Sequence, residues 1–83
     1  LTCDAEHVVV ETIKVAEDGD GLIVRLYEAH NQRGSISLTF AQPIASAEEV
    51  DLLERPQGAI SVDGATLRCA VRPFEVKTVR VRF

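Results

Sequence analysis

Several short segments of the chain alternate between hydrophobic and polar residues with the period of a β-strand. The segment 35–41 shows this most clearly, because Ile36, Leu38 and Phe40 share one face and the hydroxyl residues between them share the other. The chain is also rich in valine, isoleucine and threonine, which favour strands. These patterns predict strands over 8–16, 22–29, 35–41, 47–53, 59–62, 65–71 and 74–82.

Turn-forming sequences separate these segments at short intervals. They lie at 17–21 (E-D-G-D-G), 30–34, 55–58 and 63–64. The glycine-containing turn between the first two predicted strands indicates a hairpin. Short strands with frequent turns are typical of an antiparallel sandwich or barrel, so the sequence predicts an all-β domain.

Two of the predicted strands change phase partway along. In the first, Val8 and Val10 have one parity, whereas Ile13 and Val15 have the other. A strictly alternating strand cannot keep both halves against one core. We therefore predict a β-bulge at 11–12 and another at 77–78 in the last strand, or a crossing of each strand from one sheet to the other at that point.

The segment 45–53 fits a helix nearly as well as a strand. Its residues, A-S-A-E-E-V-D-L-L, include many helix formers, and Ser46 with Glu49 resembles a capping box. A helix there would have little to pack against among the neighbouring strands. We therefore favour a strand.

Composition limits the function classes. A chain of 83 residues forms one domain at most, spanning 1–83. Its 9 basic and 13 acidic side chains give a net charge of −4, which disfavours nucleic acid and membrane surfaces as partners. Its apolar stretches are too short for a transmembrane helix or a signal peptide. The basic residues that gather near the end are expected on an exposed strand face: Arg68, Arg72, Lys77, Arg80 and Arg82.

The cysteines bear on the cellular location. Cys3 and Cys69 lie in no spacing that is typical of a metal site. A secreted domain of this size would often carry several disulfides, so we interpret the chain as a reduced, intracellular protein and predict a cytoplasmic location. The chain begins Leu-Thr-Cys and contains no methionine, which we interpret as the mark of a piece of a larger protein.

The sequence contains no recognisable catalytic constellation. Glycoside hydrolysis needs two carboxylates at one bond, but the adjacent Glu48 and Glu49 would point to opposite faces of a strand. His7 and His30 are the only histidines, and neither has further ligands at a spacing that suits zinc. We predict no catalytic residue, no metal ligand and no cofactor in this chain.

The stretch 25–34, R-L-Y-E-A-H-N-Q-R-G, is the best candidate for binding. An aromatic ring beside amide, carboxylate and guanidinium groups can stack on a sugar and hydrogen-bond to it. The predicted carbohydrate contacts are Tyr27, Glu28, His30, Asn31 and Arg33. The alternative is that Tyr27 packs at a sheet margin and the other residues form a polar loop.

The same stretch carries a family resemblance. The string L-I-V-R-L-Y-E-A-H-N-Q-R-G, which follows V-V-V-E-T-I-K-V-A-E-D-G-D-G, resembles the C-terminal β domain of glycoside hydrolase family 38, the α-mannosidases. The closing P-F-E-V-K-T-V-R-V at 73–81 is similar to the end of those proteins. The likeness covers most of the chain, 8–83, and it implies a small immunoglobulin-like antiparallel β-sandwich.

The resemblance also implies a role. The parent enzyme would be a retaining, zinc-dependent glycosidase that hydrolyses α-linked mannose, with its catalytic carboxylates and zinc ligands in an N-terminal domain. This chain would be non-catalytic, would pack against the catalytic and other domains of the same polypeptide, and would line the substrate cleft with one loop. We therefore predict an apolar patch on the surface of the isolated domain.

Two other functions are compatible with a small sandwich. One is a stand-alone carbohydrate-binding module, which the absence of tryptophan disfavours. The other is an interaction domain that adds a partner strand at an open sheet edge. The charged last strand disfavours the second alternative, because charged residues usually protect an edge from pairing.

Overall fold

Nine strands and no helix make up the computed structural model, which describes residues 1–83. The strands are β1 (Thr2–Cys3), β2 (Val8–Val15), β3 (Leu22–Glu28), β4 (Gly34–Thr39), β5 (Ser46–Val50), β6 (Pro56–Ala59), β7 (Ser61–Asp63), β8 (Thr66–Val71) and β9 (Val76–Arg82). They form a four-stranded sheet in the order β1-β4-β8-β7 and a five-stranded sheet in the order β2-β3-β9-β5-β6.

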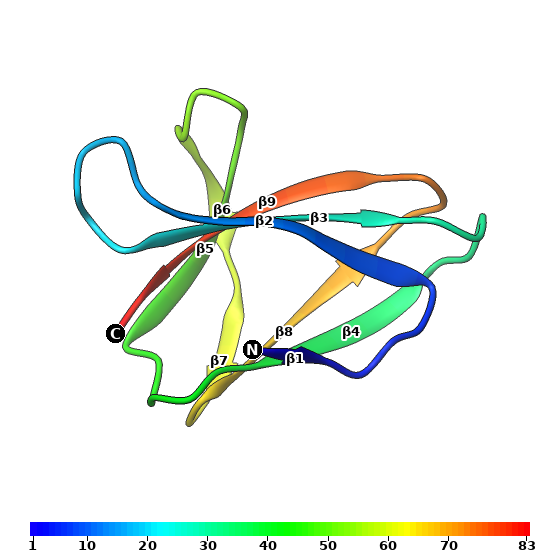
Figure 1. The fold of residues 1–83 in the computed structure, drawn as a ribbon, viewed down its shortest axis with the longest axis horizontal. Helices are drawn as coiled ribbons and strands as arrows, with labels where there is room; N and C mark the ends of the chain where they lie inside the picture. Colours follow the sequence, from blue (N-terminus) through cyan, green and yellow to red (C-terminus); the bar gives the residue numbers. More distant parts are fainter.

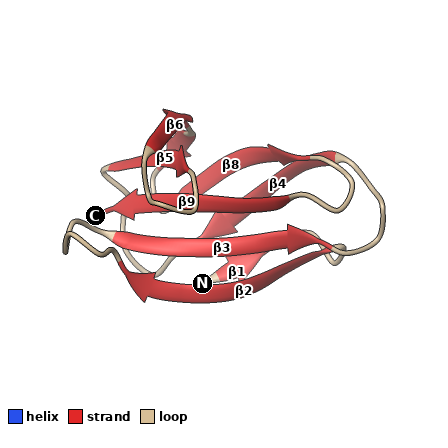
Figure 2. Cartoon of the chain, turned by 90° about the horizontal axis from the view of Figure 1, so that it is seen from above, coloured by secondary structure: helices blue, strands red, loops and turns tan.

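The two sheets pack face to face, and every strand pair is antiparallel (Figure 1, Figure 2). The predicted all-β antiparallel sandwich is therefore confirmed. The structure holds no helix with the length and apolar character that a membrane span requires.

The core lies between the sheets and consists of aliphatic side chains that alternate along the strands. The larger of two buried clusters comprises Val8, Val24, Leu26, Ile36, Leu38, Ile44, Ala47, Leu67, Val71, Val79 and Val81. Burial of apolar surface contributes about 25 cal/mol per Å², so this cluster is the main source of stability.

The bulge predicted at 11–12 is confirmed. The register between β2 and β3 shifts between Val10, which is opposite Leu26, and Thr12, which is opposite Arg25. As a result, Ile13 lies opposite the core residue Val24. Val8 and Val10 before the bulge therefore face the interior together with Ile13 and Val15 after it, whereas Val9 faces outward opposite Tyr27.

The second predicted bulge, at 77–78, is wrong. The register of β9 with β3 runs without a shift from Val76 to Val81. The alternative of a strand that crosses between sheets is also wrong for β9, because both of its neighbours, β3 and β5, belong to one sheet. The phase change has a simpler cause, since Val76 points to the outer face and is left 57% exposed.

A crossing between sheets occurs instead at 56–63. The single strand predicted at 59–62 is two strands, of which β6 pairs with β5 in one sheet and β7 pairs with β8 in the other. The ambiguous segment before it is a strand, as favoured, although β5 ends at Val50. A turn follows β5, because the Asp51 carboxylate accepts hydrogen bonds from the backbone N–H groups of Leu53 and Arg55, both at 2.9 Å.

Two of the basic residues expected on an exposed face are buried. Lys77 is 8% exposed and binds Glu49 at 3.1 Å, and Arg80 is only 4% exposed. Arg80 points to the outer face of its sheet, but the β2–β3 loop and the β5–β6 loop cover it there. These loops lie near each other at the left and top of Figure 1. For Arg80 the expectation failed because the covering loops come from distant parts of the sequence. For Lys77 it failed because this residue lies opposite the core residue Leu26, on the inner face of the sheet.

Candidate functional site

Glu28 is the last residue of β3 and the only acidic residue buried in the chain, at 1% exposed. Its side chain points to the sandwich interior, because residues 22, 24, 26 and 28 share one face of the strand. The register places it opposite Val8 at the start of β2. A buried carboxylate of this kind needs hydrogen-bond donors around it.

Three segments of the chain donate hydrogen bonds to this carboxylate. The backbone N–H of Phe74 donates to Oε1 at 3.0 Å, and the backbone N–H of His30 donates to Oε2 at 2.9 Å. The Nδ1 atom of His7 lies 2.8 Å from Oε2. Because an ionised carboxylate only accepts, Nδ1 of His7 carries the proton of this bond.

These bonds outweigh the cost of burial. Burial alone would raise the pKa of Glu28, but the N–H groups of Phe74, His30 and Gln32 and the ring of His7 together lower the pKa to about 2. Glu28 is therefore ionised at neutral pH. Both of its carboxylate oxygens accept hydrogen bonds from groups inside the domain.

The turn at Phe74, between β8 and β9, donates a hydrogen bond to the Glu28 carboxylate and forms a junction with Glu28, His7 and His30. Phe74 has a φ of 57°, in the left-handed region that bulky residues rarely adopt. The Glu75 carboxylate accepts a hydrogen bond from the N–H of Arg72 at 2.9 Å, and the backbone oxygen of Glu75 accepts from the N–H of Glu28 at 3.0 Å. The turn is thus held from both sides, and it presents the Phe74 ring to solvent at 64% exposure.

The predicted sugar contacts separate into three places. Tyr27 is half-buried on the outer face of the five-stranded sheet, between Val9 and Val76 in register. Glu28 lies on the opposite, inner face, so these two side chains do not face one ligand together. Glu28 was predicted as a surface contact, but its position inside the domain makes it a support for its neighbours.

The other three candidates lie in the exposed loop between β3 and β4. His30 is held through its backbone by Glu28, and Asn31 adopts a left-handed φ of 57°, which asparagine tolerates well. Arg33 borders a shallow hollow of about 420 Å³ whose walls also include Ser35 and Arg72. Both this loop and the Phe74 turn lie at the right-hand end of the domain in Figure 1 and Figure 2.

The two strings that prompted the resemblance therefore meet in the structure, because R-L-Y-E supplies Glu28 and P-F-E supplies the Phe74 turn. The model of the glycosyl hydrolases family 38 C-terminal beta sandwich domain matches residues 7–79. The chain belongs to this family.

Among curated relatives of this family 38 domain are α-mannosidases. This chain is 38% identical to "Alpha-mannosidase 2C1" of Mus musculus, over 87% of this chain and 7% of the mouse protein. It is 38% identical to the Homo sapiens protein of the same name, over 83% of this chain and 7% of that protein. "Alpha-mannosidase G" of Dictyostelium discoideum is 30% identical over 96% of this chain and 8% of that protein. The chain thus spans less than a tenth of these relatives.

Zinc, which the family resemblance implies for the parent enzyme, does not fit the residues of this domain. No group of three or more His, Cys, Asp or Glu side chains is placed to hold a metal ion. His7 and Glu28 form an isolated pair, and the two cysteines, Cys3 and Cys69, are free.

Sequence reasoning missed His7 and Phe74 as members of the junction. The signal for His7 was available, because the hairpin with its predicted bulge places residue 7 beside the end of β3. No feature of the sequence marked Phe74 as a turn residue, because phenylalanine rarely adopts the positive φ that it has in this turn.

Proposed function

We propose that this chain is the non-catalytic C-terminal domain of a retaining, zinc-dependent α-mannosidase, and that the intact polypeptide hydrolyses α-linked mannose. The domain supports the catalytic part of that enzyme. The observation that carries the proposal is the family match over 7–79, together with relatives that are named as α-mannosidases.

The placement of the carboxylates supports a non-catalytic role. A retaining glycosidase uses two carboxyl groups about 5–5.5 Å apart across one bond. In this chain, Glu28 is bound by three donors, Glu54 accepts a hydrogen bond from the N–H of Glu17 at 2.9 Å, and Glu48 pairs with Arg82 at 3.1 Å. The acidic groups that are least exposed are therefore already engaged in internal contacts.

We place the loop 29–33 at the margin of the substrate cleft. His30, Asn31 and Arg33 are exposed there, and the buried Glu28 carboxylate fixes the loop through the N–H of His30. A loop held on a rigid sandwich suits substrate contact, because its polar groups need little ordering on binding. Tyr27 lies at the same end of the domain, on the outer face of the five-stranded sheet beside this loop.

We also place the enzyme in the cytoplasm. Both cysteines are free thiols, and burial raises the pKa of Cys69, which keeps that thiol protonated and unreactive. Persistent free cysteines suit a reducing compartment.

The test is an assay of the longer polypeptide that carries this chain. It is expected to hydrolyse an aryl α-mannoside, to lose activity with a zinc chelator and to regain it with added zinc. Proton NMR of the first product is expected to show the α-anomer of mannose, as retention requires. Activity that resists the chelator, or a β-anomer as first product, would refute the zinc or the retention part of the proposal.

The loop assignment has its own test in the same assay. Arg33→Ala in the longer polypeptide is expected to raise KM roughly tenfold, because a hydrogen bond from a charged donor is lost. Arg68→Ala is the matched control, since Arg68 is an exposed arginine on β8 outside the loop. Equal KM values for the two variants would place the loop away from the substrate.

A further inference from the structure

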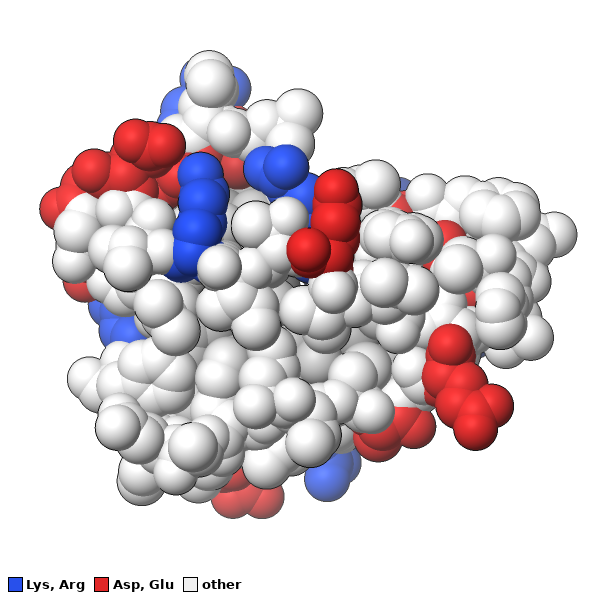
Figure 3. Space-filling model, in the orientation of Figure 1, with Lys and Arg blue, Asp and Glu red and all other residues white.

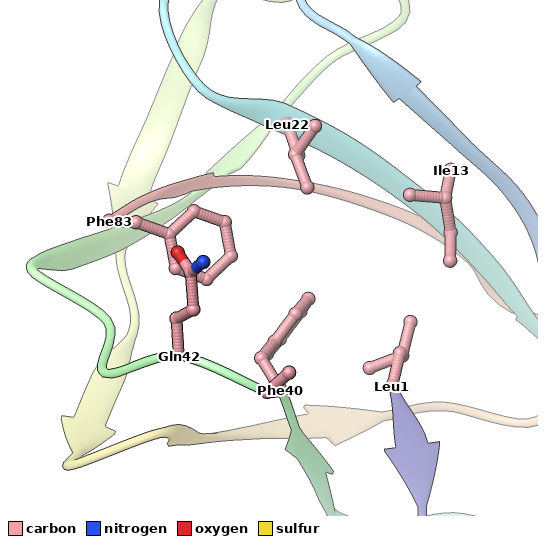
Figure 4. A pocket seen from close by; sticks show the side chains of 7 residues that line it. Leu1, Ile13, Leu22, Phe40, Gln42 and Phe83 are labelled. Carbon is pink, nitrogen blue, oxygen red and sulfur yellow. The ribbon is translucent and has the colours of Figure 1, made fainter.

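An apolar groove opens between the two sheets at one edge of the sandwich. It has a volume of about 450 Å³, and six of its seven lining residues are hydrophobic. Figure 4 shows Ile13 and Leu22 on one side, Leu1 and Phe40 on the other, and Phe83 at the end. The predicted apolar patch is therefore present on this chain.

The groove exists because the two sheets differ in extent. The bulge in β2 turns Ile13 and Val15 toward the interior, opposite Val24 and Leu22. The facing sheet does not reach them, since β1 has only two residues and β4 ends at Thr39. Ile13 and Val15 consequently occupy core-facing positions but remain 51% and 65% exposed.

Aromatic side chains close one end of the groove. The rings of Phe40 and Phe83 pack edge to face with centroids 5.6 Å apart, yet Phe83 is still 47% exposed. The surface around the opening has a broad area without charged side chains, with Lys, Arg, Asp and Glu gathered toward its margins (Figure 3). Such a surface favours an apolar occupant.

The lining chemistry excludes a sugar. Gln42 is the single polar residue in the lining, and no tyrosine, tryptophan or charged group reaches it. A sugar buried there would leave its hydroxyl groups without partners, which is costly. The groove instead suits aliphatic or aromatic side chains of a polypeptide.

We propose that the groove is filled by apolar side chains from the part of the same polypeptide that precedes this domain; this inference rests on the proposed function. The matched relatives are more than ten times longer than the aligned segment, and the family domain is C-terminal in its proteins. The occupant is therefore available in every molecule, at a high effective concentration.

The position of β1 supports this occupant. Thr2 pairs with Thr39 and Cys3 with Leu38, so the antiparallel register carries Leu1 toward Phe40. Leu1 itself lines the groove. Continued backward in this register, polypeptide that precedes Leu1 would run toward Ala41 and Gln42, which also line the groove, and so toward its opening.

Site-specific photocrosslinking in the longer polypeptide tests the proposal. The variant Ile13→p-benzoylphenylalanine is expected to crosslink, within one molecule, to a residue that precedes the domain, as mass spectrometry of the digested product would show. The matched control is the same substitution at Val76, which is similarly exposed but lies on the outer face of the same sheet. We expect at least a tenfold lower crosslink yield at that position.

Three results would overturn the proposal: a crosslink from position 13 to a second copy of the polypeptide, no crosslink from position 13, or equal yields at the two positions. Mannoside hydrolysis measured on the same samples separates this inference from the proposed function. An inactive polypeptide with the expected crosslink would remove the mannosidase assignment and leave the docking surface standing.

Discussion

Replacing Arg80 with alanine is expected to unfold the chain, with a loss of about 3–5 kcal/mol in the free energy of unfolding. The Arg80 side chain is 5% exposed, and its Nη1 atom donates to both carboxylate oxygens of Asp18 at 3.0 and 2.9 Å. It also donates to the backbone oxygens of Asp20 and Glu54. The largely buried carboxylates of Glu54 and Glu48 lie 3.6 and 3.8 Å from its guanidinium group. Its removal would leave them without this cation, in a domain whose whole stability is expected to be only ~3–5 kcal/mol.

Urea unfolding followed by circular dichroism measures this effect. Arg82→Ala is the matched control, because Arg82 lies on the same face of β9 and binds Asp20 at 2.8 Å but is 34% exposed. Exposed ion pairs contribute little, so the control should unfold at a urea concentration close to that of the wild-type chain. If the two variants unfold at the same urea concentration, the buried Arg80 cluster does not stabilise the fold.

Replacing Glu28 with glutamine is expected to release the Phe74 turn and to lower Tm by roughly 10 °C at pH 7. Glutamine has the same shape, but its amide nitrogen would face one of the N–H donors that the carboxylate now accepts from. The strained φ of Phe74 would then lose the bond that holds it. Hydrogen exchange at the N–H of Phe74 is expected to accelerate along with the loss of Tm.

The effect of Glu28 depends on pH in a defined direction. Its pKa is lowered from 4.5 to about 2 in the folded chain, so its stabilising contribution is complete above pH 4.5. That contribution is lost as the pH falls from about 4.5 to about 2. The Tm difference between the wild-type chain and Glu28→Gln is therefore expected to be large at pH 7 and to vanish near pH 2.

A suitable control is Glu6→Gln, which neutralises an exposed carboxylate adjacent to His7. It should leave Tm unchanged at both pH values.

Two other carboxylates also have lowered pKa values. Hydrogen bonds from the N–H of Asp20 and from the Arg80 side chain lower the pKa of Asp18, and hydrogen bonds from the N–H and the side chain of Arg55 lower the pKa of Asp51. The wild-type chain therefore weakens in acid for several reasons, and only the difference from the Glu28 variant isolates this junction. A Tm difference that stays constant from pH 7 to pH 2 would contradict the account.

The fold was largely predictable because its strands are short and strongly patterned. The phase change between Val10 and Ile13 correctly located a bulge, since the alternating apolar residues before and after it face the same side of the hairpin. The same reasoning failed for β9, because Val76 faces solvent and no bulge is needed to bring it to the core. The split of 56–63 between two sheets was not predictable, since it depends on the separate partners β5 and β8.

The sequence indicated that the stretch 25–34 lies at a strand end and loop, but it did not indicate how its side chains are arranged. The stretch 25–34 does mark one end of the domain, yet alternation with Val24 and Leu26 turns Glu28 inward, away from Tyr27. That alternation was visible in the sequence. The Glu28 carboxylate is buried despite the usual preference of carboxylates for the surface, because three hydrogen bonds satisfy its oxygens inside the domain. Arg80 was missed because the loops that cover it are more than twenty residues away in sequence.

The central claim is that this domain belongs to an α-mannosidase and does not carry out the reaction itself. The most direct measurement compares the rate of aryl α-mannoside hydrolysis by the longer polypeptide with the rate for residues 1–83 alone, at equal molar concentrations. We predict turnover by the longer polypeptide and none by the isolated domain. Hydrolysis by the isolated domain, or a correctly folded longer polypeptide that hydrolyses no α-mannoside, would contradict the account.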